Sequence, residues 1–186
     1  MKWVDYKKPE SLDEAISLLT ESNGTARPMA GGTDLLVQLR AGGGRVDADT
    51  IVDVKSVPEL SEISYSENNG LTIGAAVECY KIYNDSNVKK HFPALIDSAS
   101  LIGGTQIQGR ASLGGNLCNA APSGDAIPNL VVHNAIANIV GPSGAREVPV
   151  EEICVGPGRT SLASDELLVS INIPIGEPGF GANYIR

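Results

Sequence analysis

Apolar positions in the first third of the chain recur at helical and strand spacing, and they predict a small α/β unit. Ser11, followed three residues later by Glu14, forms the pattern of a helix-capping box. Apolar residues then follow at helical spacing until Asn23-Gly24, which is typical of a helix end. Three further segments continue the pattern: a strand at 27–30, a helix at 33–40 and a strand at 51–54. This alternation favours parallel strand pairing within residues 1–56.

After Pro58 the pattern becomes mixed. Two strand-like segments, 62–65 and 71–75, flank Asn69-Gly70, a dipeptide favoured in tight hairpin turns. Residues 84–91 are polar and are predicted to form a loop. The remaining predicted elements are helices at 93–102 and 125–132 and strands at 135–140 and 167–173. Residues 57–186 are therefore expected to form a larger lobe with several strands and a few helices.

Two glycine-rich segments carry the strongest chemical signal. The first, at 30–36, reads Ala-Gly-Gly-Thr-Asp-Leu-Leu, and the second extends from 103 to 125 and contains Ser-Leu-Gly-Gly-Asn at 112–116. Glycine lets the backbone approach a ligand closely and adopts the positive φ of sharp turns. The unpaired amides at a helix start, together with the helix dipole, attract anions. Two such segments suit a long ligand with a phosphate part in its middle, such as a dinucleotide.

Each segment also has a purely structural interpretation. The first lacks the lysine of a P-loop and does not match the G-x-G-x-x-G fingerprint, so it is equally explained as a link between a strand and a helix. Gly103-Gly104 has the form of a helix C-cap. Asp125 either accepts hydrogen bonds from ribose or ribityl hydroxyls or caps the helix that follows it. Both roles remain open at this point.

Composition narrows the class of partner and of chemistry. The 186 residues are 42% hydrophobic and 19% charged, with a net charge of −8, which disfavours nucleic acid as a partner. No apolar run reaches the ~20 residues of a membrane span, and the N-terminus lacks a signal-peptide pattern, so a cytoplasmic location is expected. Three isolated cysteines predict buried, reduced thiols and no metal site. Because Asp and Glu are dispersed and no nucleophile elbow is present, we predict no catalytic side chain. Any catalysis would belong to a cofactor.

The glycine-rich segments resemble a known family. The motifs at 30–36 and 103–117, with the shorter ones at 119–125, 156–160 and 165–174, are similar to the FAD-binding subunit of molybdenum hydroxylases. This family includes xanthine dehydrogenases and the medium subunit of aerobic carbon monoxide dehydrogenase. The resemblance covers essentially the whole chain, with several motifs in the same order.

The resemblance implies a fold. It is the α+β, two-lobe FAD-binding domain of the p-cresol methylhydroxylase and vanillyl-alcohol oxidase type, with FAD in the cleft between the lobes. Residues 1–56 would form a small parallel α/β lobe, and residues 57–186 a larger mixed or antiparallel lobe. Family subunits usually continue into a C-terminal domain, which is absent from this sequence.

The resemblance also implies site residues. The residues expected to wrap the pyrophosphate and adenosine are Pro28, Met29, Ala30, Gly31, Gly32, Thr33, Asp34 and Leu35. Those expected to line the flavin and its ribityl chain are Ile102, Ser112, Gly114, Gly115 and Asp125, with Gly103, Gly104 and Asn116 as further FAD-binding residues in the same segment. Cys118 lies at a position near the isoalloxazine, where a structural thiol is an equal explanation. Leu168 matches an apolar contact on the late strand, and Arg186 falls near a family lysine that contacts the flavin.

The implied function is electron transfer. A molybdenum-cofactor subunit would oxidise the substrate and pass electrons through the Fe–S clusters of a second partner subunit to FAD on this chain. The acceptor would be NAD, a quinone, ferredoxin or O2. Two other functions remain open: a self-contained flavin-dependent reductase on the same fold, such as the reductase of peptidoglycan precursor synthesis, and a non-catalytic nucleotide-binding module.

Overall fold

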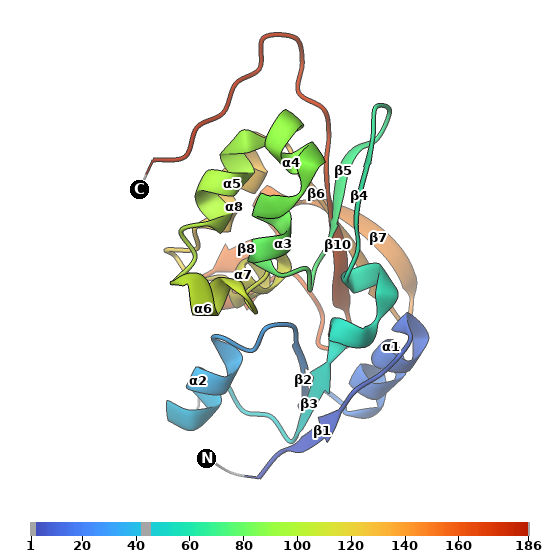
Figure 1. The fold of residues 1–186 in the computed structure, drawn as a ribbon. Coiled ribbons are helices and arrows are strands. Elements are labelled where there is room, and N and C mark those ends of the chain that lie inside the picture. The colour runs from blue at the N-terminus through green and yellow to red at the C-terminus, as the bar shows by residue number, and fades with distance from the viewer. Residues whose placement is uncertain (1–2, 42–45, 186) are drawn as a thin grey trace.

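The computed structural model describes residues 3–41 and 46–185 and contains two main β-sheets of different character (Figure 1). The smaller sheet has the strand order β1-β3-β2, and both pairings are parallel. Its elements are β1 (Asp5–Lys7), α1 (Leu12–Glu21), β2 (Ala26–Met29), α2 (Leu35–Ala41) and β3 (Thr50–Asp53). The predicted parallel pairing of the early strands is confirmed, and β1 is an edge strand that the sequence analysis did not find.

Helix α1 begins where the sequence predicts it. The Ser11 side chain accepts a hydrogen bond from the Glu14 amide at 3.2 Å, which satisfies one of the unpaired donors of the first turn. Ala15, Ile16 and Leu19 are buried along one face of the helix. The spacing of these residues explains why α1 packs against the small sheet as an amphipathic helix.

The larger sheet is antiparallel and has the order β4-β5-β10-β6-β7. Its strands are β4 (Ile63–Ser66), β5 (Gly70–Gly74), β6 (Ile136–Gly141), β7 (Gly144–Pro149) and β10 (Leu167–Ile173). The β4–β5 hairpin is confirmed, and Gly70 adopts a φ of +76° at its turn. The last strand in sequence, β10, lies at the centre, so the sheet is completed only when the C-terminal part of the chain is in place.

Six helices lie together on one side of this sheet (Figure 1). They are α3 (Cys79–Asn84), α4 (Ser86–His91), α5 (Pro93–Ala99), α6 (Thr105–Gln108), α7 (Leu113–Asn119) and α8 (Ala126–Val132). The remaining elements are the 3-10 helices η1 (Val54–Ser56), η2 (Pro58–Leu60) and η3 (Val150–Glu152), and the hairpin of β8 (Cys154–Gly156) and β9 (Arg159–Thr160). No helix in the described parts of the chain is long and apolar enough to cross a bilayer.

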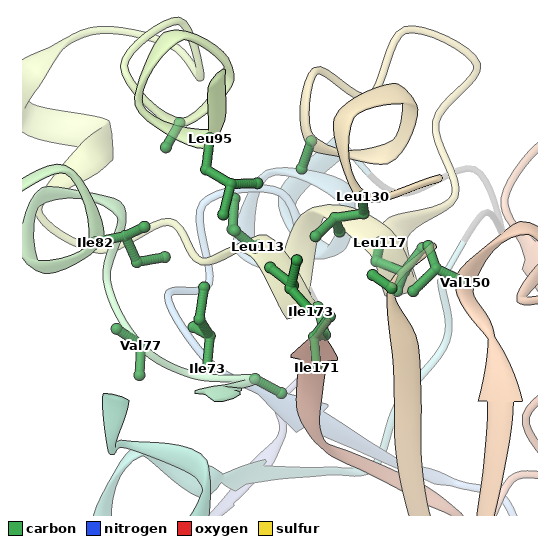
Figure 2. Close-up of a cluster of buried hydrophobic side chains, with 14 of the residues drawn as sticks. Ile73, Val77, Ile82, Leu95, Leu113, Leu117, Leu130, Val150, Ile171 and Ile173 are labelled. Atoms are coloured by element: carbon green, nitrogen blue, oxygen red, sulfur yellow. The ribbon is translucent and has the colours of Figure 1, made fainter. Parts of the chain in front are cut away.

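The central strand β10 contributes to two hydrophobic cores. Ile171 and Ile173 lie in the core between the larger sheet and its helices, where Figure 2 shows them beside Ile73, Leu113 and Leu117. Leu167 and Val169 lie in a second core with α1 and the small sheet. Residues two apart on a regular strand share a face, so the register shift of the β10–β6 pairing between Leu168 and Ser170 is what moves the later residues to the other core. One strand thus joins the cores of both sheets.

The chain is therefore an α+β fold of a small parallel sheet and a larger antiparallel sheet. All strands of the small sheet precede residue 57, and all strands of the larger one follow it. The division into lobes 1–56 and 57–186 stays a prediction, because Val54, Val57 and Leu60 on either side of it pack into one shared core.

The prediction of a loop at 84–91 is wrong. Residues Ser86–His91 form α4, and the Asp85 side chain accepts hydrogen bonds from the amides of Asn87 and Val88 at 2.8 and 3.0 Å. Val88 is fully buried and attaches the helix to the main core. A capping carboxylate, one apolar anchor and the stacking of His91 on Tyr65 stabilise this short helix, although its remaining residues are polar.

The interpretation of Gly103-Gly104 as a helix C-cap is also wrong. Helix α5 ends at Ala99, and Gly104 instead precedes α6 as its N-cap residue. The Ser-Leu-Gly-Gly-Asn motif is likewise more than a turn, because Ser112 caps α7 by accepting a hydrogen bond from the Gly115 amide at 3.0 Å. Gly114 and Gly115 thus lie within the first turn of a helix.

Ile171→Ala should destabilise the chain by about 2–5 kcal/mol, because it removes a fully buried side chain from the strand that serves both sheets. Ile175→Ala, at a side chain that is 47% exposed, is the matched control and should change stability by no more than about 0.5 kcal/mol. Urea unfolding followed by circular dichroism measures both. Equal effects of the two substitutions would contradict the central role of β10.

Candidate functional site

The first glycine-rich turn presents a row of unpaired amides. In the part of the chain that the structure describes, no oxygen accepts a hydrogen bond from the backbone N–H groups of residues 31–35. Gly32 has a φ of +74°, which a side chain would strain. The first bonds of the following helix are Leu36 N to Gly32 O at 3.1 Å and Gln38 N to Asp34 O at 2.9 Å. Successive unpaired amides at the start of a helix form a concavity suited to an anion.

The second glycine-rich segment lies directly against this turn. The Arg110 Nε donates a hydrogen bond to the Gly31 carbonyl at 2.9 Å, although the two residues are 79 positions apart. A Cβ atom at Gly31 would lie 2.0 Å from the Arg110 carbonyl oxygen, so no other residue fits there without movement of the backbone. A second link joins Gln38 Nε2 to Asn119 Oδ1 at 2.9 Å. The structure therefore brings the two glycine-rich segments together.

The glycines of the second segment differ in what surrounds them. A Cβ at Gly114 would lie 2.5 Å from the Ala75 carbonyl oxygen, so this glycine allows α7 to pack closely on the end of β5. Gly115 is exposed, and a Cβ there would meet only the Ser112 Oγ at 3.0 Å. Gly104 is also exposed, with only the Gln106 Oε1 at 3.5 Å, and Gly103 adopts a φ of +61°. Gly104 and Gly115 leave backbone open to a ligand, whereas Gly114 serves internal packing.

Asp125 does not act as the cap of the helix that follows it. It occupies the N-cap position of α8, but its side chain makes no capping hydrogen bond and instead accepts one from the Tyr184 hydroxyl at 3.0 Å. The first amide of the helix, that of Ala126, donates to the Asn116 Oδ1 at 3.1 Å. The capping alternative is therefore wrong for Asp125, and Asn116 takes that role from the neighbouring helix α7.

The other predicted residues lie at varied depths. Ile102 and Leu168 are buried in the core of the larger lobe, and Met29 is buried beneath the first turn in the core of the small one. Leu35 opens α2, Pro28 belongs to β2, and Ala30, Thr33 and Asp34 lie in the turn between these elements. Arg186 falls outside the described residues. No group of three His, Cys, Asp or Glu in the described parts of the chain is placed to hold a metal ion.

The cysteines only partly match the predicted buried thiols. Cys79 is buried, and burial raises the pKa of its thiol to about 12, so it remains protonated. Cys118 is exposed on α7, four residues after Gly114, contrary to the prediction of a buried thiol. Cys154 lies between these extremes, and its Sγ donates a weak hydrogen bond to the Leu117 carbonyl at 3.6 Å.

A polar chain centred on the buried Asp53, which the sequence analysis missed, supports the first turn. The Tyr6 hydroxyl donates to Asp53 Oδ2 at 2.6 Å, and Lys55 Nζ lies 2.5 Å from Asp53 Oδ1 and donates to the Ala30 carbonyl at 3.0 Å. Burial alone would raise the pKa of Asp53, but the hydrogen bonds from Lys55 and Tyr6 lower it below its ordinary value. The same bond to Asp53 raises the pKa of Tyr6. The signal in the sequence was a carboxylate at the end of a buried strand with a lysine two residues later.

Gly31→Ala should destabilise the chain by about 1–3 kcal/mol or more, because its methyl group would be forced into the backbone of Arg110. Gly104→Ala is the control, since a Cβ there meets only the end of a flexible side chain. Its effect should stay within about 0.5 kcal/mol. Urea unfolding measures both variants, and equal stability of Gly31→Ala and the parent chain would contradict the tight contact.

Asp53 should make the fold sensitive to acid. Because folding lowers the pKa of this carboxyl, its stabilising contribution is complete above its ordinary pKa and is lost as the pH falls through the folded-state value. Asp53→Asn should therefore be less stable than the parent chain at neutral pH, with a difference that shrinks toward low pH. The free energy of unfolding in urea, measured at a series of pH values, tests this. A constant difference across the series would contradict it.

Comparison with known proteins gives the family. Residues 2–176 match the family model described as "FAD binding domain in molybdopterin dehydrogenase". The chain is 38% identical over 172 residues to the xanthine dehydrogenase FAD-binding subunit of Escherichia coli O157:H7, covering 92% of this chain and 58% of the relative. It is 29% identical over 180 residues to the carbon monoxide dehydrogenase medium chain of Afipia carboxidovorans, covering 97% and 62%. The chain thus spans about three fifths of the length of these relatives.

Solved structures agree with this assignment. The fold matches reconstituted CO dehydrogenase from Oligotropha carboxidovorans with a TM-score of 0.90 and 27% identity, covering 95% of this chain and 60% of that one. It matches quinoline 2-oxidoreductase from Pseudomonas putida 86 with a TM-score of 0.88 and 31% identity, covering 95% and 61%. The expected two-lobe fold of this family is confirmed. The chain belongs to the family of FAD-binding domains of molybdopterin dehydrogenases.

Proposed function

We propose that this chain binds FAD across its two glycine-rich segments and serves as the electron-transfer subunit of a molybdenum-containing dehydrogenase. The observation that carries the proposal is the row of amides at residues 31–35, which has no acceptor within the described structure. A diphosphate supplies the negative oxygens that such a row binds, and the helix start at Leu35 adds the favourable end of its dipole. The residues present therefore fit the central part of FAD.

The remaining contacts follow from the position of the second segment. We assign the pyrophosphate and adenosine to residues 28–35, and the ribityl chain and flavin to the segment that Arg110 holds against them. In that segment the exposed backbone of Gly104 and Gly115 leaves room for the ligand, and the half-buried carboxylate of Asp125 is a suitable acceptor for ribityl hydroxyls. The family resemblance supports the further assignments: Ile102, Gly103, Ser112, Gly114, Asn116, Cys118, Leu168 and Arg186.

The chemistry of this subunit belongs to its cofactor. FAD, when bound, accepts and releases electrons, whereas the protein supplies binding, orientation and electrostatics. This chain's own residues contribute a fixed anion site at 31–35, a carboxylate at Asp125 and a thiol at Cys118, close in sequence to the open backbone of Gly115. None of these roles requires an acid, a base or a nucleophile in the described structure.

We infer the path of electrons from the family of FAD-binding domains in molybdopterin dehydrogenases, whose relatives include a xanthine dehydrogenase FAD-binding subunit and a carbon monoxide dehydrogenase medium chain. We infer that a partner subunit with Fe–S clusters delivers electrons to FAD on this chain. A second partner with the molybdenum cofactor would oxidise the substrate, and NAD, a quinone, ferredoxin or O2 would accept the electrons. A cytoplasmic location remains a prediction of the sequence.

Gly115→Val should abolish retention of FAD while the protein still folds. Valine at this exposed position occupies the space assigned to the ligand, and inside the molecule it meets only the Ser112 hydroxyl. We expect FAD affinity to fall by about tenfold or more. The visible flavin spectrum of the full chain after incubation with FAD and gel filtration gives the measurement.

Gly109→Val is the matched control on the same segment. Gly109 is exposed and helical, with a φ of −68°, and a Cβ there lies 3.7 Å or more from its neighbours. This variant should retain FAD like the parent chain. A folded Gly115→Val protein with unchanged affinity would remove the site assignment. FAD retained without turnover of any substrate by the isolated chain would separate the subunit from a self-contained reductase.

A further inference from the structure

Two cationic side chains bind successive carbonyls on the back of the first glycine-rich turn. Lys55 Nζ donates to the Ala30 carbonyl at 3.0 Å, and Arg110 Nε donates to the Gly31 carbonyl at 2.9 Å. Lys55 follows β3 of the small sheet, whereas Arg110 lies between α6 and α7 of the larger part. The turn is thus held by one charged donor that follows the small sheet and one that belongs to the second glycine-rich segment.

Each cation is itself fixed in place. Lys55 forms an ion pair with Asp53, whose side chain is only 7% exposed, and Asp53 also accepts hydrogen bonds from the Tyr6 hydroxyl and the Lys55 amide. The backbone of Arg110 is fixed because its carbonyl packs against Gly31, and the hydrogen bond from Nε to the Gly31 carbonyl holds its exposed side chain. Both cations are thus already bound to the turn before a ligand arrives, which lowers the entropic cost of binding.

Fixing these carbonyls determines the direction of the amides. In a planar trans peptide the C=O of one residue and the N–H of the next point in opposite directions. A donor behind the Ala30 carbonyl therefore turns the Gly31 N–H forward, and a donor behind the Gly31 carbonyl does the same for the Gly32 N–H. These two amides begin the unpaired row at residues 31–35.

We propose that Lys55 and Arg110 are positioning residues for a diphosphate ligand. They orient the Gly31 and Gly32 amides toward it and place two positive charges behind the turn. The proposal rests on the FAD site proposed above and adds to it the two residues that orient the amides for the diphosphate. Charge behind the turn offsets the negative charge of the ligand most strongly where solvent is excluded. Lys55, whose side chain is 27% exposed, should therefore contribute more than the exposed Arg110.

The test measures binding of FAD and of ADP, which carries the diphosphate without the flavin, to the full chain at several salt concentrations. Lys55→Met and Arg110→Met should each weaken both ligands by about tenfold. The dependence of affinity on salt should become shallower, because a charge has been removed. Lys55→Arg, which keeps the charge, should retain part of the affinity that Lys55→Met loses. A side chain with a merely structural role would not make affinity depend on the charge at this position.

Arg146→Met is the matched control. Arg146, on the edge strand β7, forms a bidentate pair with Glu166 at 2.7 Å and also donates to the Ser161 carbonyl, so these partners lie outside the glycine-rich turn. Its loss should leave the affinity for FAD and ADP unchanged. Because Lys55→Met leaves the Asp53 carboxylate without its cation, the double variant Lys55→Met/Asp53→Asn removes both charges together and keeps the variant series foldable.

The outcomes separate this proposal from the proposed function. A wild-type chain that binds neither FAD nor ADP overturns both. A wild-type chain that binds FAD, with folded Arg110→Met and Lys55→Met/Asp53→Asn variants that bind FAD and ADP as tightly as the wild type, overturns only the role of the two cations. Loss of ADP affinity in these variants but not in Arg146→Met supports it.

Discussion

The contact between the Cα of Gly31 and the carbonyl of Arg110 is the constraint on which the site depends. It joins the turn that follows β2 of the small sheet to the second glycine-rich segment. A methyl group added at Gly31 would overlap the Arg110 carbonyl oxygen. The hydrogen bond from Arg110 Nε to the Gly31 carbonyl reinforces the same contact from the other side. Because both glycine-rich segments are fixed by this one approach, they keep a constant position relative to each other, which the proposed FAD site across them requires.

The fold supports this arrangement through β10. The first part of β10 packs into the core beneath α1 and its later part into the core under the helices, on either side of a register shift between Leu168 and Ser170. Movement of the two sheets relative to each other would therefore disturb both cores. Close-packed cores respond to strain by shifting between discrete arrangements and do not deform continuously. A strand from the end of the chain therefore stabilises the geometry of a turn near its beginning, although the two have no direct sequence relation.

Local pattern predicted the elements whose signal is local. The Ser11 cap, the apolar face of α1, the hairpin at Gly70 and the apolar β10 were all found because neighbouring residues carry the information. Helix α4 was missed because Val88 is its one apolar anchor, and its other support, the stacking of His91 on Tyr65, comes from a residue far away in the sequence. Lys55 and Arg110 were missed for a different reason: their carbonyl partners lie 25 and 79 residues away, and periodicity carries no signal at such separations. The FAD contacts assigned by resemblance remain predictions.

The net charge of the whole chain and the donors of the first turn act on an anion in opposite directions. A net charge of −8 would repel an anionic dinucleotide at long range, yet the first turn offers five amides with two cations behind it. At 0.1 M salt, repulsion between exposed charges more than about 10 Å apart is largely screened. Short hydrogen bonds in a partly covered site are screened much less. We therefore expect affinity for a diphosphate to depend on the few groups that contact the turn. The acidic remainder of the surface is left to influence which protein partners approach.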